Sequence, residues 1–207
     1  MPQLDIDLLR SQNVYTQAEI DAIIYQNQGS YDSKNVEVIW RDLFHRKAIG
    51  TSQNMTFFDG NLTDLTITNV NGNALPAAES FTVYEIWLRT LFVGAVATPN
   101  ALVQAAINYL NTSVLELTIQ NKAPIAQIPC SRFVPAMAVY ADNAALTNAK
   151  TGEFYSDSSF ELKVPKVIGE KVSFAAKITG GVAPAAILNT AAVQFEVGLT
   201  GLTVRGR

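Results

Sequence analysis

The chain has 207 residues, of which 15 are basic and 18 are acidic, so that its formal net charge is −3. Charged residues make up 16% of the chain and hydrophobic residues 48%. This composition excludes a largely disordered chain and a nucleic-acid binder that works by bulk positive charge. The single cysteine, Cys130, excludes an intrachain disulfide, and the single histidine, His45, excludes a metal site with two or more histidine ligands.

The N-terminal segment carries Asp5 and Asp7 and has neither the basic region nor the apolar region of a secretory signal. The apolar run Leu91–Ala97 is much shorter than the ~20 residues that a membrane-spanning helix needs. A lone cysteine is typical of a reducing compartment. The sequence therefore predicts a soluble protein that is made in a cytoplasm.

Two segments are predicted to be helices, Thr16–Gln28 and Pro99–Leu110. In the first, Thr16 and Glu19 have the spacing of a capping box, and a glycine follows the last residue. In the second, Thr98 suits the N-cap, a proline follows it, and apolar residues recur on one face. We expect the first helix to belong to an N-terminal arm, residues 1–30, and the second to be inserted between strands of a domain formed by residues 31–207.

Most of the remaining chain is predicted to form short strands, because apolar and polar residues alternate between turn signals. Asp59-Gly60 is a hairpin turn signal between the second and third of these segments. Strands do not alternate regularly with helices, which excludes a doubly wound α/β fold. The pattern predicts an all-β, antiparallel, two-sheet sandwich. The predicted strands are Val36–Phe44, Met55–Phe58, Leu62–Val70, Phe81–Val93, Val114–Ile119, Ala123–Ile128, Phe160–Val164, Val172–Ile178, Val193–Gly198 and Leu202–Arg205.

The longest predicted strand, Phe81–Val93, has bulky residues at consecutive positions. Strict alternation would put Phe81 and Trp87 on one face, and Tyr84 and Ile86 on the other. The strand is therefore predicted to carry aromatic side chains on both faces.

The residues that could carry chemistry do not form a convincing catalytic or metal site. Cys130 follows Ile-Pro with no helix start to activate it, and His45 lies in a basic stretch, so a nucleophilic dyad is disfavoured. Glu85 and Glu116 are the best pair for glycoside hydrolysis, but carboxylates that alternate with apolar residues usually face solvent. The Asp59-Gly60-Asn61 segment has too few oxygen ligands for a calcium loop. We therefore expect no catalytic residue, no cofactor and no metal, and a protein that is not an enzyme.

The features that remain indicate contacts with other protein chains. Trp40 and Trp87 are the large aromatic anchors that interfaces favour, although core packing is the alternative for at least one of them. The first residues, with Leu8 and Tyr15, form an arm that we expect to become ordered on a neighbouring molecule. Arg205 belongs to a small basic group near the C-terminal end. Low charge is typical of surfaces that pack against copies of themselves.

The layout of the chain resembles the jelly-roll coat proteins of tailless icosahedral bacteriophages. The likeness is carried by the helix Pro99–Leu110 between strands, by the closing run Phe195–Arg205, and by Leu115–Lys122 with the Ile128-Pro129 and Arg132-Phe133 pairs that follow it. The resemblance implies a single eight-stranded jelly roll that forms trimers or pentamers and tiles the shell of a virion together with other capsid proteins. It does not decide between a major coat protein and a vertex protein.

The N-terminal arm departs from the basic arms by which many small coat proteins condense their genome. It has Asp5 and Asp7 against Arg10 alone. Direct neutralisation of phosphates by this arm is therefore not expected. The hypothesis that follows is that another protein contacts the genome, or that an internal membrane layer separates it from the shell.

Two other interpretations remain open from the sequence. A carbohydrate-binding or receptor-binding sandwich of the vertex or fibre type would expose aromatic side chains, namely Trp87, or Tyr84 with Tyr155, beside polar partners. An enzyme on a β-sandwich of the cupin type would need several histidine ligands, and the chain has one. The coat-protein interpretation is favoured over both.

Overall fold

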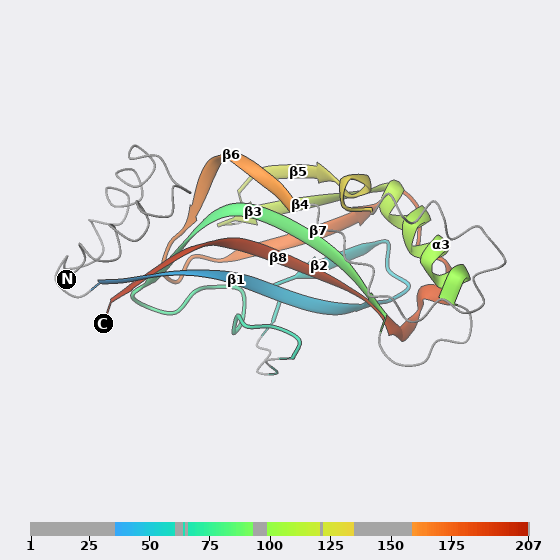
Figure 1. Cartoon of the computed structure of the whole chain (residues 1–207), viewed down its shortest axis with the longest axis horizontal. Helices are drawn as coiled ribbons and strands as arrows, with labels where there is room; N and C mark the ends of the chain where they lie inside the picture. The colour runs from blue at the N-terminus through green and yellow to red at the C-terminus, as the bar shows by residue number, and fades with distance from the viewer. Residues whose placement is uncertain are drawn as a thin grey trace.

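The computed structural model describes residues 36–60, 64, 66–92, 99–120, 122–134 and 159–206. This part of the chain is mostly β, in two antiparallel four-stranded sheets, with one α-helix (Figure 1). The predicted helix Thr16–Gln28 and the predicted arm, with Leu8 and Tyr15, lie outside the described residues. The antiparallel β class that alternation predicts is confirmed.

The first sheet has the strand order β1-β8-β3-β6 and the second has the order β2-β7-β4-β5. Within them the first strand pairs with the eighth, the second with the seventh, the third with the sixth and the fourth with the fifth. Two further pairings, β3 with β8 and β4 with β7, complete the sheets. The strands are β1 (Val36–Ile49), β2 (Asn54–Phe57), β3 (Glu79–Phe92), β4 (Ser113–Ile119), β5 (Ala126–Pro129), β6 (Ser159–Ile168), β7 (Phe174–Gly180) and β8 (Thr190–Gly206).

The inward faces of the two sheets share one hydrophobic core. Phe57 and Phe174 come from the second sheet, Phe81 and Phe195 come from the first, and none is more than 2% exposed. Burial of each such side chain contributes about 1.5–3 kcal/mol to folding. The core is therefore filled by large side chains from both layers.

Strict alternation in β3 was a wrong prediction. The register of β3 against β8 shifts between Val83 and Glu85, so that Tyr84 is an extra residue. An extra residue switches the face of every side chain after it. Phe81 and Ile86, predicted on opposite faces, are therefore both in the core and 0% exposed.

The predicted hairpin at Asp59-Gly60 was also wrong. The strand before it, β2, pairs with β7, and the described part of Leu62–Val70 contains turns and one isolated bridge from Thr68 to His45. The Asp64 carboxylate accepts hydrogen bonds from the backbone N–H (2.9 Å) and the hydroxyl (2.7 Å) of Thr66. Such a side-chain turn competes with strand pairing.

Two predicted strands, Val193–Gly198 and Leu202–Arg205, belong to the single strand β8, which has 17 residues. Smaller differences concern boundaries. β1 continues to Ile49, and the segment predicted from Ala123 pairs only from Ala126. Because β8 is the central partner of both β1 and β3, its length sets the extent of the first sheet.

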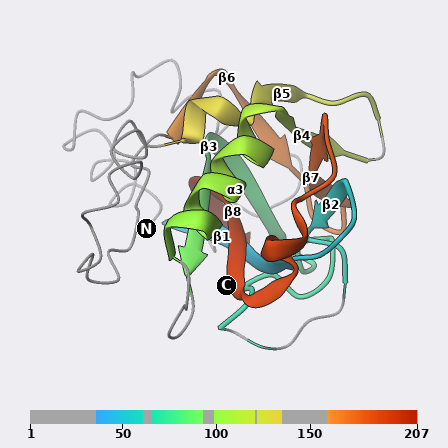
Figure 2. The same cartoon turned by 90° about the vertical axis from the view of Figure 1, so that its right-hand side faces the viewer.

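The predicted helix between strands is confirmed as α3 (Pro99–Asn111). It lies across one end of the sheets, as Figure 2 shows. Leu102, Ala106 and Tyr109 are buried in the shared core, and the Tyr109 ring stacks on Phe195 with centroids 5.9 Å apart. Two short 3-10 helices, η1 (Cys130–Phe133) and η3 (Ala186–Leu188), lie close to it.

Candidate functional site

The two predicted tryptophan anchors lie on the same outward face of the first sheet. Trp40 of β1 is opposite Leu202 of β8, and Trp87 of β3 is opposite Gly198. Trp87 alternates with the core residues Ile86 and Leu88. This outward face, formed by β1, β8 and β3, is the candidate interface.

Trp40 and Trp87 differ in exposure. Trp40 is 44% exposed, and its ring lies 5.8 Å from the ring of Tyr84, measured between centroids. Trp87 and Tyr84 are each 8% exposed. Trp40 is therefore the tryptophan available to a partner, whereas Trp87 is part of the packed structure.

Trp87 is held in place on three sides. A Cβ built on Gly198 would lie 1.9 Å from the indole ring, so the absence of a side chain there lets the ring lie against the strand. The indole N–H donates to the Thr200 hydroxyl (3.1 Å), which donates to the Asp42 carboxylate (2.5 Å). The Arg89 guanidinium lies 4.4 Å from the ring centroid, in cation–π geometry.

A row of three charged residues crosses the same face. Arg46, Glu196 and Arg89 are directly opposite one another on β1, β8 and β3. Arg46 donates two hydrogen bonds to one carboxylate oxygen of Glu196, at 3.0 Å and 2.7 Å, and Arg89 lies 4.0 Å from the other oxygen. The Glu196 side chain is only 7% exposed. The row joins three strands and carries a net positive charge. Its member on β3, Arg89, is the arginine that covers Trp87.

Local sequence patterns do not predict this row. Arg46 and Glu196 are 150 positions apart and become neighbours only through the register of β1 and β8. One signal was present: Gly198 lies inside an alternating pattern, and a glycine in a strand often marks a close approach by another group.

Arg205 is also predicted for the interface, but it does not belong to this face. Arg205 is exposed near the end of β8, opposite Glu37 and Glu79. Leu8 and Tyr15 lie outside the described residues. The structure therefore places Trp40 and Trp87, but not Arg205, on this face.

Neither half of the Cys130–His45 dyad has the environment of a nucleophilic pair. Cys130 is 0% exposed, and burial raises the pKa of its thiol to about 12. His45 is 2% exposed, and its Nδ1 accepts a hydrogen bond from the backbone N–H of Phe58 (2.7 Å). A thiolate at neutral pH requires a lowered pKa, so the geometry disfavours this chemistry.

The two carboxylates that come nearest to a hydrolytic pair in the sequence, Glu85 and Glu116, lie on different sheets. Glu85 is on the outward face of β3, where it is opposite Glu161 of β6. Glu116 is on the outward face of β4 and accepts a hydrogen bond from Gln127 (2.8 Å). The two outward faces point in opposite directions, so these side chains cannot flank one bond.

The acidic residues in and after the Asp59-Gly60 segment, which the sequence disfavours as a calcium loop, have other partners. Asp59 forms an ion pair with Lys47 (2.8 Å), and Asp64 accepts hydrogen bonds from Thr66. Within the described ranges, no group of three or more His, Cys, Asp or Glu side chains could hold a metal ion.

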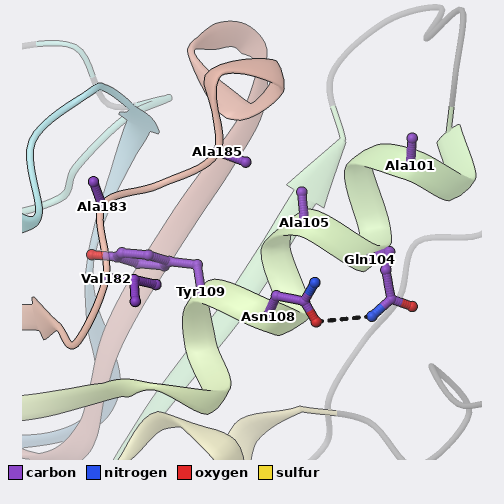
Figure 3. A pocket seen from close by; sticks show the side chains of 8 residues that line it. All are labelled: Ala101, Gln104, Ala105, Asn108, Tyr109, Val182, Ala183 and Ala185. Atoms are coloured by element: carbon purple, nitrogen blue, oxygen red, sulfur yellow. Dashed lines mark hydrogen bonds between the residues drawn. The ribbon is translucent and has the colours of Figure 1, made fainter.

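A shallow apolar hollow of about 410 Å³ lies beside α3 (Figure 3). It faces the connection between β7 and β8, and Val182 on that connection is 52% exposed. A hydrogen bond between Gln104 and Asn108 (2.9 Å) forms one rim. The lining residues are Ala101, Gln104, Ala105, Asn108, Tyr109, Val182, Ala183 and Ala185. Its walls are mainly apolar and present few polar groups to a ligand.

Comparison with known proteins gives the chain no family: no model of a known protein family matches it, and no curated protein matches it. In the part of the chain that the structure describes, no helix is long and apolar enough to cross a membrane. The functional argument therefore depends on the fold and on the candidate interface.

Proposed function

We propose that the chain is a structural virion protein, a self-assembling jelly-roll capsid protein of an icosahedral phage. In this proposal the folded unit is a rigid tile that forms trimers or pentamers, which assemble into a shell together with other capsid proteins. The protein would be made in the host cytoplasm and act in the virion.

The observation that carries the proposal is the pairing pattern of the eight strands. One long antiparallel hairpin would pair the first strand with the eighth, the second with the seventh, the third with the sixth and the fourth with the fifth. Rolling that hairpin up brings the third strand against the eighth and the fourth against the seventh. These pairings occur in the two sheets, and they support the proposal of a jelly-roll sandwich. The inserted helix α3 agrees with the layout on which the resemblance rests.

The filled interior favours a structural tile over a ligand-binding barrel. Phe57, Phe81, Phe174 and Phe195 occupy the space between the sheets. Jelly rolls also occur in lectins and enzymes, which present a ligand site in the interior or on an aromatic platform. The carbohydrate-binding or receptor-binding alternative predicts that Trp87 or Tyr84 is exposed, and both are buried. Tyr155 lies outside the described residues.

The partners in this proposal are other copies of the chain and other shell proteins, with an internal membrane layer beneath them as one arrangement. The acidic N-terminal arm would not neutralise the genome directly. Salt-sensitive packaging of nucleic acid by shells made only of this chain would contradict that part of the proposal.

The test is the mass distribution of the purified chain, measured by light scattering on a sizing column with negative-stain images of each peak. Trimers, pentamers or closed particles are expected. A protein that remains monomeric at all concentrations and is retained on a glycan matrix would support the binding-module alternative instead. Deletion of residues 1–15 should leave the far-ultraviolet circular dichroism of the sheets unchanged and reduce assembly. Unchanged assembly would exclude the arm as a contact between copies.

A further inference from the structure

His45, the single histidine of the chain, lies at the corner where β1 meets the end of β2. Its ring is edge-on to the rings of Phe57 and Phe58, with centroids 5.9 Å and 5.8 Å away. Phe58 in turn lies 5.1 Å from Phe174 of β7, measured between ring centroids. A single imidazole is thus packed into the aromatic cluster that joins the two sheets.

The imidazole is joined to an unusual backbone position. Its Nδ1 accepts the hydrogen bond of the Phe58 backbone N–H at 2.7 Å. Phe58 has φ 58°, a left-handed conformation that bulky residues rarely adopt. The side chain of Phe58 is 1% exposed. Water therefore cannot easily replace the imidazole as the hydrogen-bond acceptor at this turn.

We propose that His45 makes a proton-sensitive contact that holds the Phe58 turn, and with it the edge strand β2, against the rest of the fold. Only the neutral imidazole can accept a hydrogen bond at Nδ1, because the imidazolium donates from both nitrogens. Protonation would therefore make two hydrogen-bond donors, the Nδ1–H and the Phe58 N–H, face each other inside the core with no acceptor between them. The turn would have to open, and the short strand β2, which has four residues, would be released first. This device is independent of the proposed function.

The charges that face His45 are those of Lys47 and Asp59. Lys47 donates to the Thr56 carbonyl oxygen (3.0 Å) and pairs with Asp59 (2.8 Å), so both lie at the same corner. Arg46 and Glu196 occupy the opposite face of the first sheet. From β8 the residue directly opposite His45 is the apolar Val197, and the backbone of Thr68 bridges to His45 from the 66–70 segment.

Burial lowers the pKa of His45 below its ordinary value of 6.5, Asp59 opposes this shift, and Lys47 adds to it. Because the folded-state pKa lies below the unfolded one, the unfolded chain binds more protons in the interval between them. The contribution of neutral His45 to stability is therefore complete above the unfolded value. It is lost as the pH falls from there through the folded value.

The test is a titration of the imidazole by nuclear magnetic resonance, from about pH 8 to about pH 4.5, with hydrogen exchange of the Phe58 amide measured on the same samples. A single histidine makes the assignment unambiguous. We expect an unprotonated Nδ1 at high pH, a midpoint below 6.5, and a roughly tenfold or greater fall in Phe58 protection across that midpoint, after correction for intrinsic exchange. A midpoint at or above 6.5, or Phe58 protection that does not change across the titration, would overturn the proposal.

Variants distinguish loss of the His45 contact from other effects of low pH on the fold. His45→Asn keeps an acceptor oxygen near the position of Nδ1 but does not titrate, so Phe58 protection should stay the same at both ends of the pH range. Asp59→Asn removes the charge that favours the imidazolium, so the midpoint should move to lower pH. If His45→Asn lost protection at the same pH as the wild type, the proposal would be wrong. If that variant did not fold, the wild-type titration would still decide.

Discussion

The outward faces of the two sheets are built differently. On the second sheet, β7 alternates without interruption between buried and half-buried side chains, and its outward residues are Ala175, Lys177 and Thr179. On the first sheet, outward positions are packed as well: Leu202 is 0% and Val204 is 3% exposed, although both alternate with residues of the core. The second sheet therefore has one packed face, whereas the first is also packed on its outward side along β8.

This difference bears on function because the packed outward positions of the first sheet cannot be altered without disturbing the fold, whereas the exposed Trp40 can. Trp87 and the Arg46–Glu196–Arg89 row fix the outward geometry of one part of the first sheet. Trp40 projects from the same face opposite Leu202, six positions along β8 from Glu196. A rigid surface that presents one exposed aromatic anchor is suited to a repeated contact between copies. The second sheet has no comparable anchor among its described outward residues.

The largest loss of stability is expected in the core that the two sheets share. Phe195→Ala removes a fully buried ring that stacks on Tyr109, and should lower the free energy of unfolding by ~3–5 kcal/mol. Urea denaturation followed by fluorescence measures this change. A loss below ~1 kcal/mol would mean that the layers are not closely packed against each other.

The next largest effect should distinguish the outward face of the first sheet from an ordinary solvent face. Gly198→Ala places a methyl group 1.9 Å from the Trp87 ring, so the ring must move. Overpacking of this kind costs about 1–3 kcal/mol. Gly60→Ala is the matched control, because nothing lies within 4 Å of a Cβ there. Equal stability of the two variants in urea denaturation would show that Trp87 does not lie over β8.

A pair of charge substitutions compares the two outward faces directly. Glu196→Gln removes the charge between two arginines at a site that is 5% exposed, and should cost roughly 1–3 kcal/mol. Glu116→Gln on the second sheet keeps a polar partner for Gln127 at an accessible position, and should change stability by less than about 0.5 kcal/mol. Thermal unfolding of both variants measures the difference. A larger loss for Glu116→Gln would reverse the comparison.

The same contrast explains what could be predicted from the sequence. β4 and β7 were recognised because they alternate regularly, and α3 because of its N-cap, its proline and its apolar stripe. In the first sheet, the sequence pattern predicts that Gly198 ends one strand and that Gly201 lies in the gap before another. They are instead positions where a Cβ would meet the Trp87 ring and the Thr82 carbonyl, each at 1.9 Å.

The candidate interface was predictable only in part, for a related reason. Trp40 and Trp87 stood out as large aromatic residues, but the extra residue at Tyr84 has no signal in the sequence and decides which face Trp87 occupies. The partners of Glu196 come from strands that are distant along the chain, and only the register places them opposite it. Local patterns therefore identified the residues and not their arrangement.

The smallest effect on folding is expected from Val114→Lys, on the outward face of β4, where the side chain is 37% exposed. A surface substitution of this kind usually changes stability by less than about 0.5 kcal/mol. It should also leave the oligomeric state unchanged, because the contact between copies is expected on the other sheet. Trp40→Lys is the matched change there and should shift the light-scattering mass toward the monomer, because a charge at the centre of an interface is strongly disfavoured. If Val114→Lys dissociated the assembly and Trp40→Lys did not, the second sheet would be the interface, and the close packing of the first would serve only the stability of the fold.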